Sequence, residues 1–320
     1  MHSESVDLIS EEKPDRVQIK QLDNHVWRIG PLGSPRVLSS YLIADEKIAI
    51  IDCGPSSVIS ELSSLVAQCS IGPKEIDYLL LTHIHLDHAG GAARFLQQYP
   101  NARVMIPERG YRHMLEPSAL NASSLPIIGE EIFRRWGACE PVPAERAERV
   151  SPYSKIGLGE TEVEYIPATG HAPHHNVLKM SQSSIVFSAD SMGIVDKQTN
   201  SIVPTCPPPS FDFPQALKDI SMVEAFSPRL SCIAHFEEVQ PTKSLFERVT
   251  GSYQKWSERA LELIMKKKLK AYDLNDCREL FSRMVEDFPQ YGSLSSDLKE
   301  QAIRIDCAGI LNYHLRASAL

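Results

Sequence analysis

The stretch THIHLDHAGG, Thr82 to Gly91, places three histidines and an aspartate just after the apolar run Ile76 to Leu81. The apolar run predicts a strand that is covered on both faces. The first two histidines are two residues apart, so in extended backbone at the strand end their rings point to the same side. Asp87 and the third histidine, His88, follow as the chain bends. Imidazole nitrogens and carboxylate oxygens are ligands that zinc takes, so the stretch predicts a metal site.

Three other segments place a polar residue at or near the end of a predicted strand. They are the turn TGHAPHH from Thr169 to His175, the strand end that carries Asp190 and the strand end that carries His235. Taken alone, such an aspartate is typical of a turn cap, and such a histidine of a buried ring bonded to a backbone carbonyl. Loops at strand ends can converge on one edge of a sheet, so the whole set predicts the remaining ligands of the metal site.

The hydrophobic pattern predicts strands and helices in two successive blocks. The first has strands at 17–22, 25–29, 38–43, 47–51, 76–81 and 102–106 and helices at 55–69, 92–99 and 108–137, the last broken at Pro117 and Pro126. The second has strands at 161–166, 176–180, 184–188 and 230–234 and a helix at 213–226 that Asp212 caps. An irregular proline-rich loop occupies 202–210, and the helices 245–270, 274–288 and 296–316 follow Pro241. This order predicts two layers of sheet covered by helices, with a helical C-terminal annex.

Composition narrows the class of protein. The chain has 320 residues, of which 42 % are hydrophobic and 23 % charged, the balance of a globular protein. Its net charge of −8 disfavours a surface for nucleic acid, and no apolar run approaches the roughly 18 residues of a membrane-spanning helix. The N-terminus has no signal-peptide pattern, and the seven scattered cysteines do not form a disulfide framework. We therefore expect a cytoplasmic protein.

With these residues in this order, the sequence resembles the metallo-β-lactamase superfamily. The family signature is H-x-H-x-D-H, then a G-H turn, an aspartate and a late histidine, each at a strand end. The resemblance runs from about Val17 to Phe236 and includes an early strand-ending aspartate, Asp52. The turn TGHAPHH is similar to that of glyoxalase II and the acyl-homoserine lactonases. The resemblance implies the α/β fold of the family, an αββα sandwich with the metal site at one edge, here with a helical C-terminal extension.

The resemblance also implies which residues hold metal. The three imidazoles of a first ion are those of His83, His85 and His171. A second ion takes the carboxylate of Asp87 and the imidazoles of His88 and His235, and Asp190 bridges the two ions. Three neutral imidazoles leave a coordination position open for water, which is the mark of a catalytic zinc site. We expect two Zn²⁺ ions per chain, with Fe or Mn as alternatives.

Four residues receive further roles. Asp87 is the expected catalytic residue, because a carboxylate there can hold the attacking water and pass a proton to the leaving group. Asp52 is expected to accept a hydrogen bond from a ligand histidine and so fix its tautomer. His174 and His175 are expected to support the ligands or to line the substrate pocket.

The leading hypothesis is a dinuclear metal-dependent hydrolase, in which a metal-bound hydroxide attacks the carbonyl of an ester, thioester or lactone of a small metabolite. Three alternatives stay open: an iron-dependent persulfide dioxygenase using His83, His171 and Asp190, a phosphodiesterase or nuclease, and a metal-containing binding protein without turnover. Two departures from family patterns matter here: His174 stands where the turn of the family has a glycine, and Gly193 stands where many lactonases have a carbonyl-binding tyrosine. The ligand cluster has Asp at position 87 and is not the Glu-containing variant of flavodiiron proteins, which disfavours an oxygen-reducing role.

Three segments are expected along the chain. Residues 1–15 form a flexible N-terminus, 16–240 the metallo-β-lactamase-like metal-binding domain, and 241–320 a helical extension packed on it. The helices of the extension look too few to bury their own apolar faces, and they are a candidate homodimer interface. The expected partner is a small-molecule substrate, with neither nucleic acid nor membrane.

Overall fold

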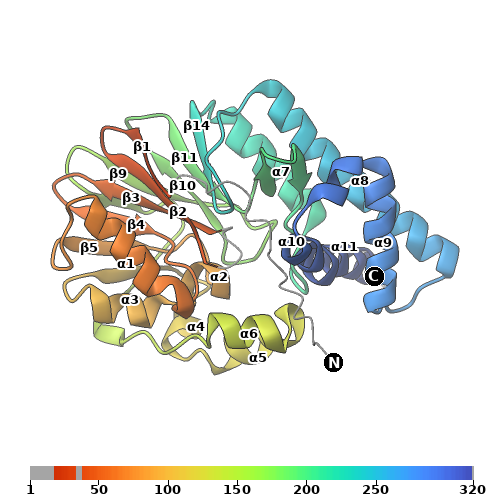
Figure 1. Ribbon diagram of the computed structural model, residues 1–320, viewed down its shortest axis with the longest axis horizontal. Helices are drawn as coiled ribbons and strands as arrows, with labels where there is room; N and C mark the ends of the chain where they lie inside the picture. Colours follow the sequence, from red (N-terminus) through yellow and green to blue (C-terminus); the bar gives the residue numbers. More distant parts are fainter. Residues whose placement is uncertain (1–17, 34–37, 319–320) are drawn as a thin grey trace, which may run out of the picture.

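Two β-sheets packed face to face form the centre of the computed structural model, which describes residues 18–33 and 38–318 (Figure 1). Within those residues the larger sheet has the order β1-β2-β3-β4-β5-β6-β7. Its strands are Ile19–Asp23, Val26–Leu32, Leu38–Ala44, Ile48–Ile51, Ile76–Leu80, Arg103–Pro107 and Ala147–Val150. The strands β1 to β4 pair antiparallel, whereas β4 to β7 pair in parallel. Parallel strands end at the same edge, so the C-terminal ends of β4 and β5 lie together.

The smaller sheet has the order β14-β11-β10-β9-β8. In chain order its strands are Lys155–Gly157, Glu162–Pro167, Asn176–Met180, Ile185–Ala189 and Leu230–Ile233. Because β10 is antiparallel to both β9 and β11, and β14 is parallel to β11, the strands β9, β11 and β14 all run in one direction. Tyr41 and Leu80 from one sheet and Tyr165 and Phe187 from the other pack into the core between the sheets.

Helices cover the outer face of the larger sheet. They are α1 (Ile59–Gln68), α3 (Ala92–Gln98), α4 (Tyr111–Leu115), α5 (Ser118–Ile128) and α6 (Glu130–Trp136). Leu62 and Phe95 from these helices are buried against Ile50 and Leu79 of the strands. This cluster is the core between the larger sheet and the helices on its outer face.

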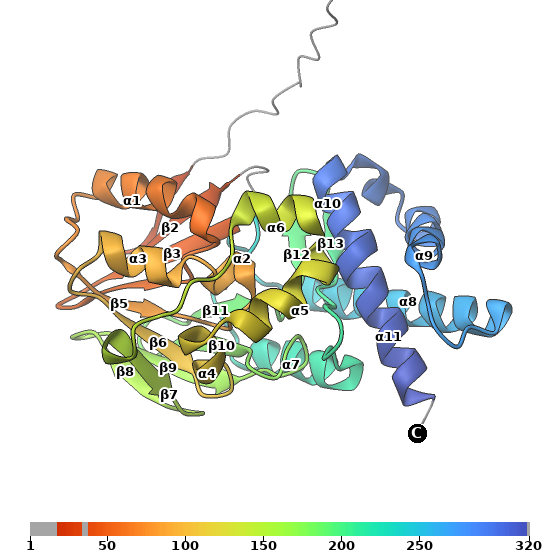
Figure 2. The ribbon, with the colours of Figure 1, turned by 90° about the horizontal axis from the view of Figure 1, so that it is seen from below.

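The C-terminal helices pack on α7 (Phe213–Ala225), which belongs to the same buried cluster as strands of the smaller sheet. They are α8 (Lys243–Lys267), α9 (Leu274–Asp287), α10 (Ser296–Gln301), a π-helical turn (Ala302–Cys307) and α11 (Ala308–Ala317). Trp256 and Leu280 belong to the same buried cluster as Val177 and Val186 of the sheet, so the annex and the sandwich share one core. The π-helical turn also contacts α5, and Figure 2 shows α10 and α11 beside α5 and α6.

The annex packs tightly on the loop that follows the short hairpin of β12 (Ile194–Asp196) and β13 (Ser201–Val203). A β-carbon at Gly309 would lie 1.4 Å from the carbonyl oxygen of Cys206, so α11 and the loop touch backbone to backbone. Asp306 accepts a hydrogen bond from the N–H of Cys206 through Oδ1 at 2.8 Å. Burial raises the pKa of Asp306 well above its usual value, which favours the neutral form of this carboxyl group.

The predicted sandwich, the order of its strands and helices, and the cap of α7 by Asp212 are confirmed. The predicted break at Pro126 is wrong: this proline lies inside α5, and the chain turns at Gly129, where φ is +84°. The hairpin β12–β13 and the strands β7 and β8 were not predicted. The predicted flexible N-terminus lies outside the described residues, and the domain boundary at 240 stays a prediction. Across residues 18–33 and 38–318, no helix combines the length and the apolar character needed to cross a membrane.

Candidate metal centre

Loops at the C-terminal ends of five strands bring the predicted site residues to one edge of the sandwich. Asp52 follows β4, His83 to His88 follow β5, and the other three ligands follow β9, β11 and β14. The short helix α2 (Leu86–Ala89) carries two of the predicted ligands of the second ion. The backbone N–H of Asn176 in the smaller sheet donates to the carbonyl oxygen of Thr82 at 3.0 Å, which ties the two sheets together beside the histidine motif.

Three residues at these strand ends have left-handed backbone. The φ angles are +51° at Asp52, +45° at Ala189, next to Asp190, and +65° at Phe236, next to His235. A non-glycine residue in this conformation costs of the order of 1–3 kcal/mol and persists only where its surroundings hold it. The strained backbone therefore lies at or next to residues that are predicted to form or support the metal site.

The three histidines predicted to hold the first ion meet at their ring nitrogens. His85 Nδ1 lies 3.1 Å from His83 Nε2 and 3.0 Å from His171 Nε2. The other ring nitrogens of two of them are engaged: His171 Nδ1 contacts the carbonyl oxygen of Thr205 at 3.2 Å, and His83 Nδ1 contacts the hydroxyl of Thr82 at 3.0 Å. Because those nitrogens donate, the facing ones carry lone pairs, which is the arrangement that a metal ion needs.

The second group lies next to the first. Asp87 Oδ2 lies 3.6 Å from His88 Nε2 and 4.0 Å from His235 Nε2. Asp190 reaches both groups: Oδ2 is 3.0 Å from His88 Nε2 and 3.4 Å from both His83 Nε2 and His171 Nε2, and Oδ1 is 3.2 Å from His235 Nε2. The position of Asp190 between the two groups fits a bridging carboxylate.

Buried polar atoms without partners support this fit. Among the described residues, neither His88 Nε2 nor Asp190 Oδ1 makes a hydrogen bond of acceptable geometry, although each is buried. Buried polar groups of this kind are costly unless something pairs with them. In the groups His83, His85, His171 and Asp87, His88, His235, the ligand atoms lie within 4.8 Å of one another. A pair of divalent cations would satisfy these atoms.

The protonation of the site points the same way. Burial lowers the pKa of His83, His85 and His171, so all three rings are neutral and able to bind metal. Burial also acts to lower the pKa of His88, but the carboxylates of Asp190 and Asp87 outweigh it and raise that pKa well above its usual value. The edge of the sandwich is thus built to hold positive charge beside its carboxylates.

Asp52 supports ligands of both groups, as the sequence predicts for one of them. Its Oδ2 accepts from His88 Nδ1 at 2.9 Å and from the Thr82 hydroxyl at 2.7 Å, and its Oδ1 accepts from the Thr82 N–H at 2.8 Å. The Thr82 hydroxyl in turn contacts His83. One carboxylate therefore fixes the tautomers of two ligand histidines.

Asp52→Asn is expected to lower metal affinity by about 10–100-fold while the fold is kept. Asparagine tolerates the left-handed backbone at this position, but its amide has only one oxygen, so it cannot accept from both His88 and the Thr82 N–H. Competition with a chromogenic chelator measures the effect. The matched control is Asp77→Asn, because Asp77 accepts the Ile48 N–H at 2.8 Å near the start of β5, the end of that strand away from the ligands. Equal affinities in wild type and Asp52→Asn would contradict the assigned role.

His175 and His174 lie beside the ligands in different ways. His175 is buried, with Nδ1 on the carbonyl oxygen of Ala168 at 3.0 Å and Nε2 accepting from the N–H of Asp190 at 3.2 Å. It therefore holds the backbone of the bridging residue. His174 is partly exposed, and its ring stacks against that of His83 with centroids 6.0 Å apart. Its Nδ1 is buried and has no partner in the described part of the chain, so of the two histidines only His174 leaves part of its ring open to a substrate.

Thr205 is a site residue that the sequence does not reveal. It lies in the proline-rich loop, and it contacts two ligands from there: its carbonyl oxygen meets His171, and its hydroxyl donates to the carbonyl oxygen of Asp190 at 2.7 Å. A lone threonine between prolines gives no pattern to read. Thr82 could have been found, because it directly precedes the histidine motif.

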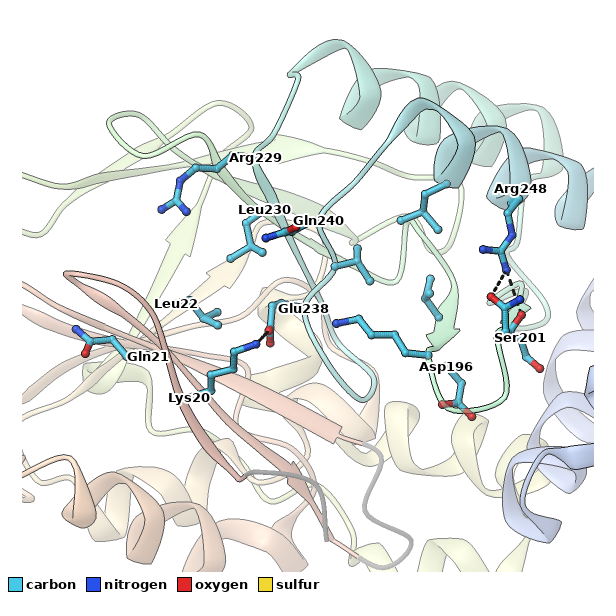
Figure 3. Close-up of a pocket in the computed structure, with 15 residues that line it drawn as sticks. Lys20, Gln21, Leu22, Asp196, Ser201, Arg229, Leu230, Glu238, Gln240 and Arg248 are labelled. Carbon is cyan, nitrogen blue, oxygen red and sulfur yellow. Dashed lines mark hydrogen bonds and ion pairs between the residues drawn. The ribbon is translucent and has the colours of Figure 1, made fainter. Parts of the chain in front are cut away.

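A separate cavity of about 560 Å³ lies away from these ligands (Figure 3). It is lined by parts of β1, β14, the hairpin β12–β13 and α8, and none of the seven predicted ligands, all within the described residues, lines it. Lys20 points to Glu238, with Nζ 2.5 Å from the carboxylate, and Arg248 donates to Asn200 Oδ1 at 2.8 Å. Because none of the predicted ligands lines it, this cavity is not the metal centre.

Comparison with known proteins places the chain in a family. The family model for the metallo-beta-lactamase superfamily matches residues 33–272. A metallo-beta-lactamase fold-containing protein of Sulfurisphaera tokodaii is 26% identical over 222 residues, which cover 68% of this chain and 79% of that protein. The probable metallo-hydrolase YybB of Bacillus subtilis is 26% identical over 245 residues, covering 74% of this chain and 100% of that protein.

Two further similarities concern fold and chemistry. A metallo-beta-lactamase family protein of Thermus thermophilus has a similar structure, with a TM-score of 0.68 at 16% identity over 93% of this chain and 95% of that one. A rubredoxin-oxygen oxidoreductase of Megalodesulfovibrio gigas is 30% identical over 92 residues, covering only 29% of this chain and 22% of that protein. The names of these relatives thus include a probable metallo-hydrolase and an oxidoreductase. The match of the family model to most of the chain, together with the fold, shows that this protein belongs to the metallo-beta-lactamase superfamily.

Proposed function

We propose that this protein is a dinuclear metal-dependent hydrolase that opens an ester, thioester or lactone of a small molecule. The observation that carries the proposal is the convergence of three neutral imidazoles, an Asp-His-His group and a carboxylate between them. His83, His85 and His171 would hold the first ion, Asp87, His88 and His235 the second, and Asp190 would bridge them. When bound there, two such ions would supply Lewis-acid chemistry, polarising a carbonyl oxygen and lowering the pKa of a water.

The side chains of the protein divide the remaining work. Asp87 is partly exposed, with 19% of its side chain accessible, whereas Asp190 is 2% exposed. The accessible carboxylate is therefore the one that can orient a water and exchange a proton with the leaving group. His174 is partly exposed beside the ligands, so its ring can line the substrate pocket and help to position a substrate. We assign these two residues to proton transfer and substrate positioning.

The lactonase branch lacks specific support. Gly193 has a φ of +67°, and a β-carbon there would lie 2.6 Å from the carbonyl oxygen of Val203. A tyrosine cannot be placed at this position without moving β13, so a substrate carbonyl must find another hydrogen-bond donor. We therefore propose the wider class of carboxylic ester, thioester and lactone substrates, with zinc as the metal.

The test is a substrate screen paired with metal analysis. Purified protein loaded with zinc is expected to hold two ions per chain and to hydrolyse at least one compound among lactones, thioesters and simple esters. Removal of the metal by a chelator should abolish turnover, and zinc should restore it. Turnover confined to phosphodiesters, or to β-lactams, would overturn the substrate class while leaving the metal centre in place.

An oxidoreductase is the second candidate, because of the similarity to part of a rubredoxin-oxygen oxidoreductase. In that case His83, His171 and Asp190 would hold a single iron as in a persulfide dioxygenase. One iron per chain and oxygen consumption with a persulfide would favour this candidate over the hydrolase. The cytoplasmic location and a homodimer through the C-terminal helices remain proposals that rest on the sequence.

A further inference from the structure

We infer that Tyr253 in α8 and Thr205 in the proline-rich loop are positioning residues of the metal centre, through which the C-terminal annex holds His171 and Asp190 in place. The inference rests on the metal site of the proposed function and on no particular substrate. The carrying observation is an unbroken chain of hydrogen bonds from the annex to two predicted ligands.

The direction of each hydrogen bond follows from the groups involved. The Tyr253 oxygen accepts from the N–H of Thr205 at 3.1 Å and lies 3.2 Å from the Thr205 hydroxyl. The Thr205 hydroxyl donates its one proton to the carbonyl oxygen of Asp190 at 2.7 Å. The Tyr253 proton must therefore go to the Thr205 oxygen, so both hydroxyl groups are used as donor and as acceptor.

The same threonine fixes the tautomer of a metal ligand. Its carbonyl oxygen lies 3.2 Å from His171 Nδ1, and a carbonyl oxygen can only accept. His171 Nδ1 is therefore protonated, which leaves the lone pair on Nε2, the nitrogen that faces His85 and Asp190. Metal-binding histidines depend on such a partner for ring orientation and for basicity.

The groups that form this series of hydrogen bonds are buried and therefore held in place. Tyr253 is 2% exposed and Thr205 4% exposed, and the ring of Tyr253 stacks on Phe211 with centroids 6.4 Å apart. Burial raises the pKa of Tyr253 well above its usual value, so the phenol keeps the proton that it donates. The annex thus contributes orientation to the site without contributing a ligand.

The experiment measures metal affinity and needs no substrate. Tyr253→Phe and Thr205→Val remove one hydroxyl each while keeping the shape of the side chain. Each is expected to weaken one of the two metal-binding steps by about 10–100-fold in chelator competition, and to shift the visible absorption spectrum of the cobalt(II)-substituted protein. The double variant should lose little more than either single variant, because both changes break one chain.

Two further variants separate positioning from general loosening of the annex. Tyr291→Phe removes another buried phenol of the annex, whose oxygen contacts Ser252 Oγ at 3.1 Å and Trp256 Nε1 at 3.3 Å and no predicted ligand among the described residues. It should bind both ions like wild type. Thr205→Ser keeps the hydroxyl and should also bind like wild type.

The inference is overturned if Tyr253→Phe keeps wild-type affinity, if it and Tyr291→Phe weaken binding equally, or if Thr205→Ser loses as much as Thr205→Val. Should Tyr253→Phe fail to fold, the comparison of the two Thr205 variants decides. A protein that binds two ions but hydrolyses nothing would refute the proposed function and leave this inference standing.

Discussion

Asp190→Ala is expected to abolish turnover, with a loss of at least about 1000-fold. Asp190 lies between both groups of ligands, with carboxylate oxygens 3.0 Å from His88 Nε2 and 3.2 Å from His235 Nε2. Burial acts to raise its pKa, but the nearby histidines outweigh that effect and hold the pKa well below its usual value, so the carboxylate is ionised. Without it, two cations would face each other unscreened. Metal ions supply several kcal/mol of transition-state stabilisation, and ~4 kcal/mol corresponds to that rate factor.

The measurement pairs turnover with bound metal after exhaustive dialysis. Asp190→Ala should retain less than one ion per chain. Asp196→Ala is the control, because Asp196 is also a buried aspartate after β11 but accepts from Gln198 N and from Thr199 Oγ1 at 3.0 and 2.8 Å. It should bind two ions even if it melts at a lower temperature. Two tightly held ions in Asp190→Ala would show that Asp190 is not the bridge.

Asp87→Asn should separate catalysis from metal binding. The amide can still coordinate weakly through its oxygen, but it cannot take up a proton. Because general acid–base catalysis contributes about 10²–10⁴-fold, turnover should fall by at least about 100-fold. Bound metal should fall much less, because Asp190 and two histidines still hold the second ion.

The decisive comparison is the ratio of turnover to bound metal. Zinc supplied in excess should refill the site of Asp87→Asn without restoring its rate. Asp87→Glu serves as the control that keeps a carboxylate, and it should retain more turnover per bound ion than the amide does. If zinc in excess brought Asp87→Asn back to the wild-type rate, the residue would be a ligand and nothing more.

The sequence predicts the site where ligands are clustered or mark strand ends. One apolar strand is followed by four of the predicted ligands, and their spacing alone predicts a metal site: His83, His85, Asp87 and His88. Asp190 and His235 are single residues, and only their order along the chain and their places at strand ends connect them to the motif. The two-block pattern of strands was enough to predict that there are two sheets, because buried strands carry long apolar runs, but it did not include the edge strands β7 and β8.

What the sequence does not predict depends on contacts between distant segments. Thr205 and Tyr253 are ordinary residues whose role arises only when α8 packs against the proline-rich loop. The break in the helical segment was misplaced at Pro126 because a proline near the last turn removes one hydrogen bond, whereas the left-handed backbone of Gly129 ends the helix. The hairpin β12–β13 is too short, at three residues a strand, for an alternating pattern to show.

The backbone contact between Gly309 and Cys206 has an evolutionary consequence. With no room for even a methyl group between them, the annex and the loop carrying Thr205 must change together or not at all. A chimera that grafts this annex onto a relative would have to transplant the loop as well, or the ligand histidine would lose its support.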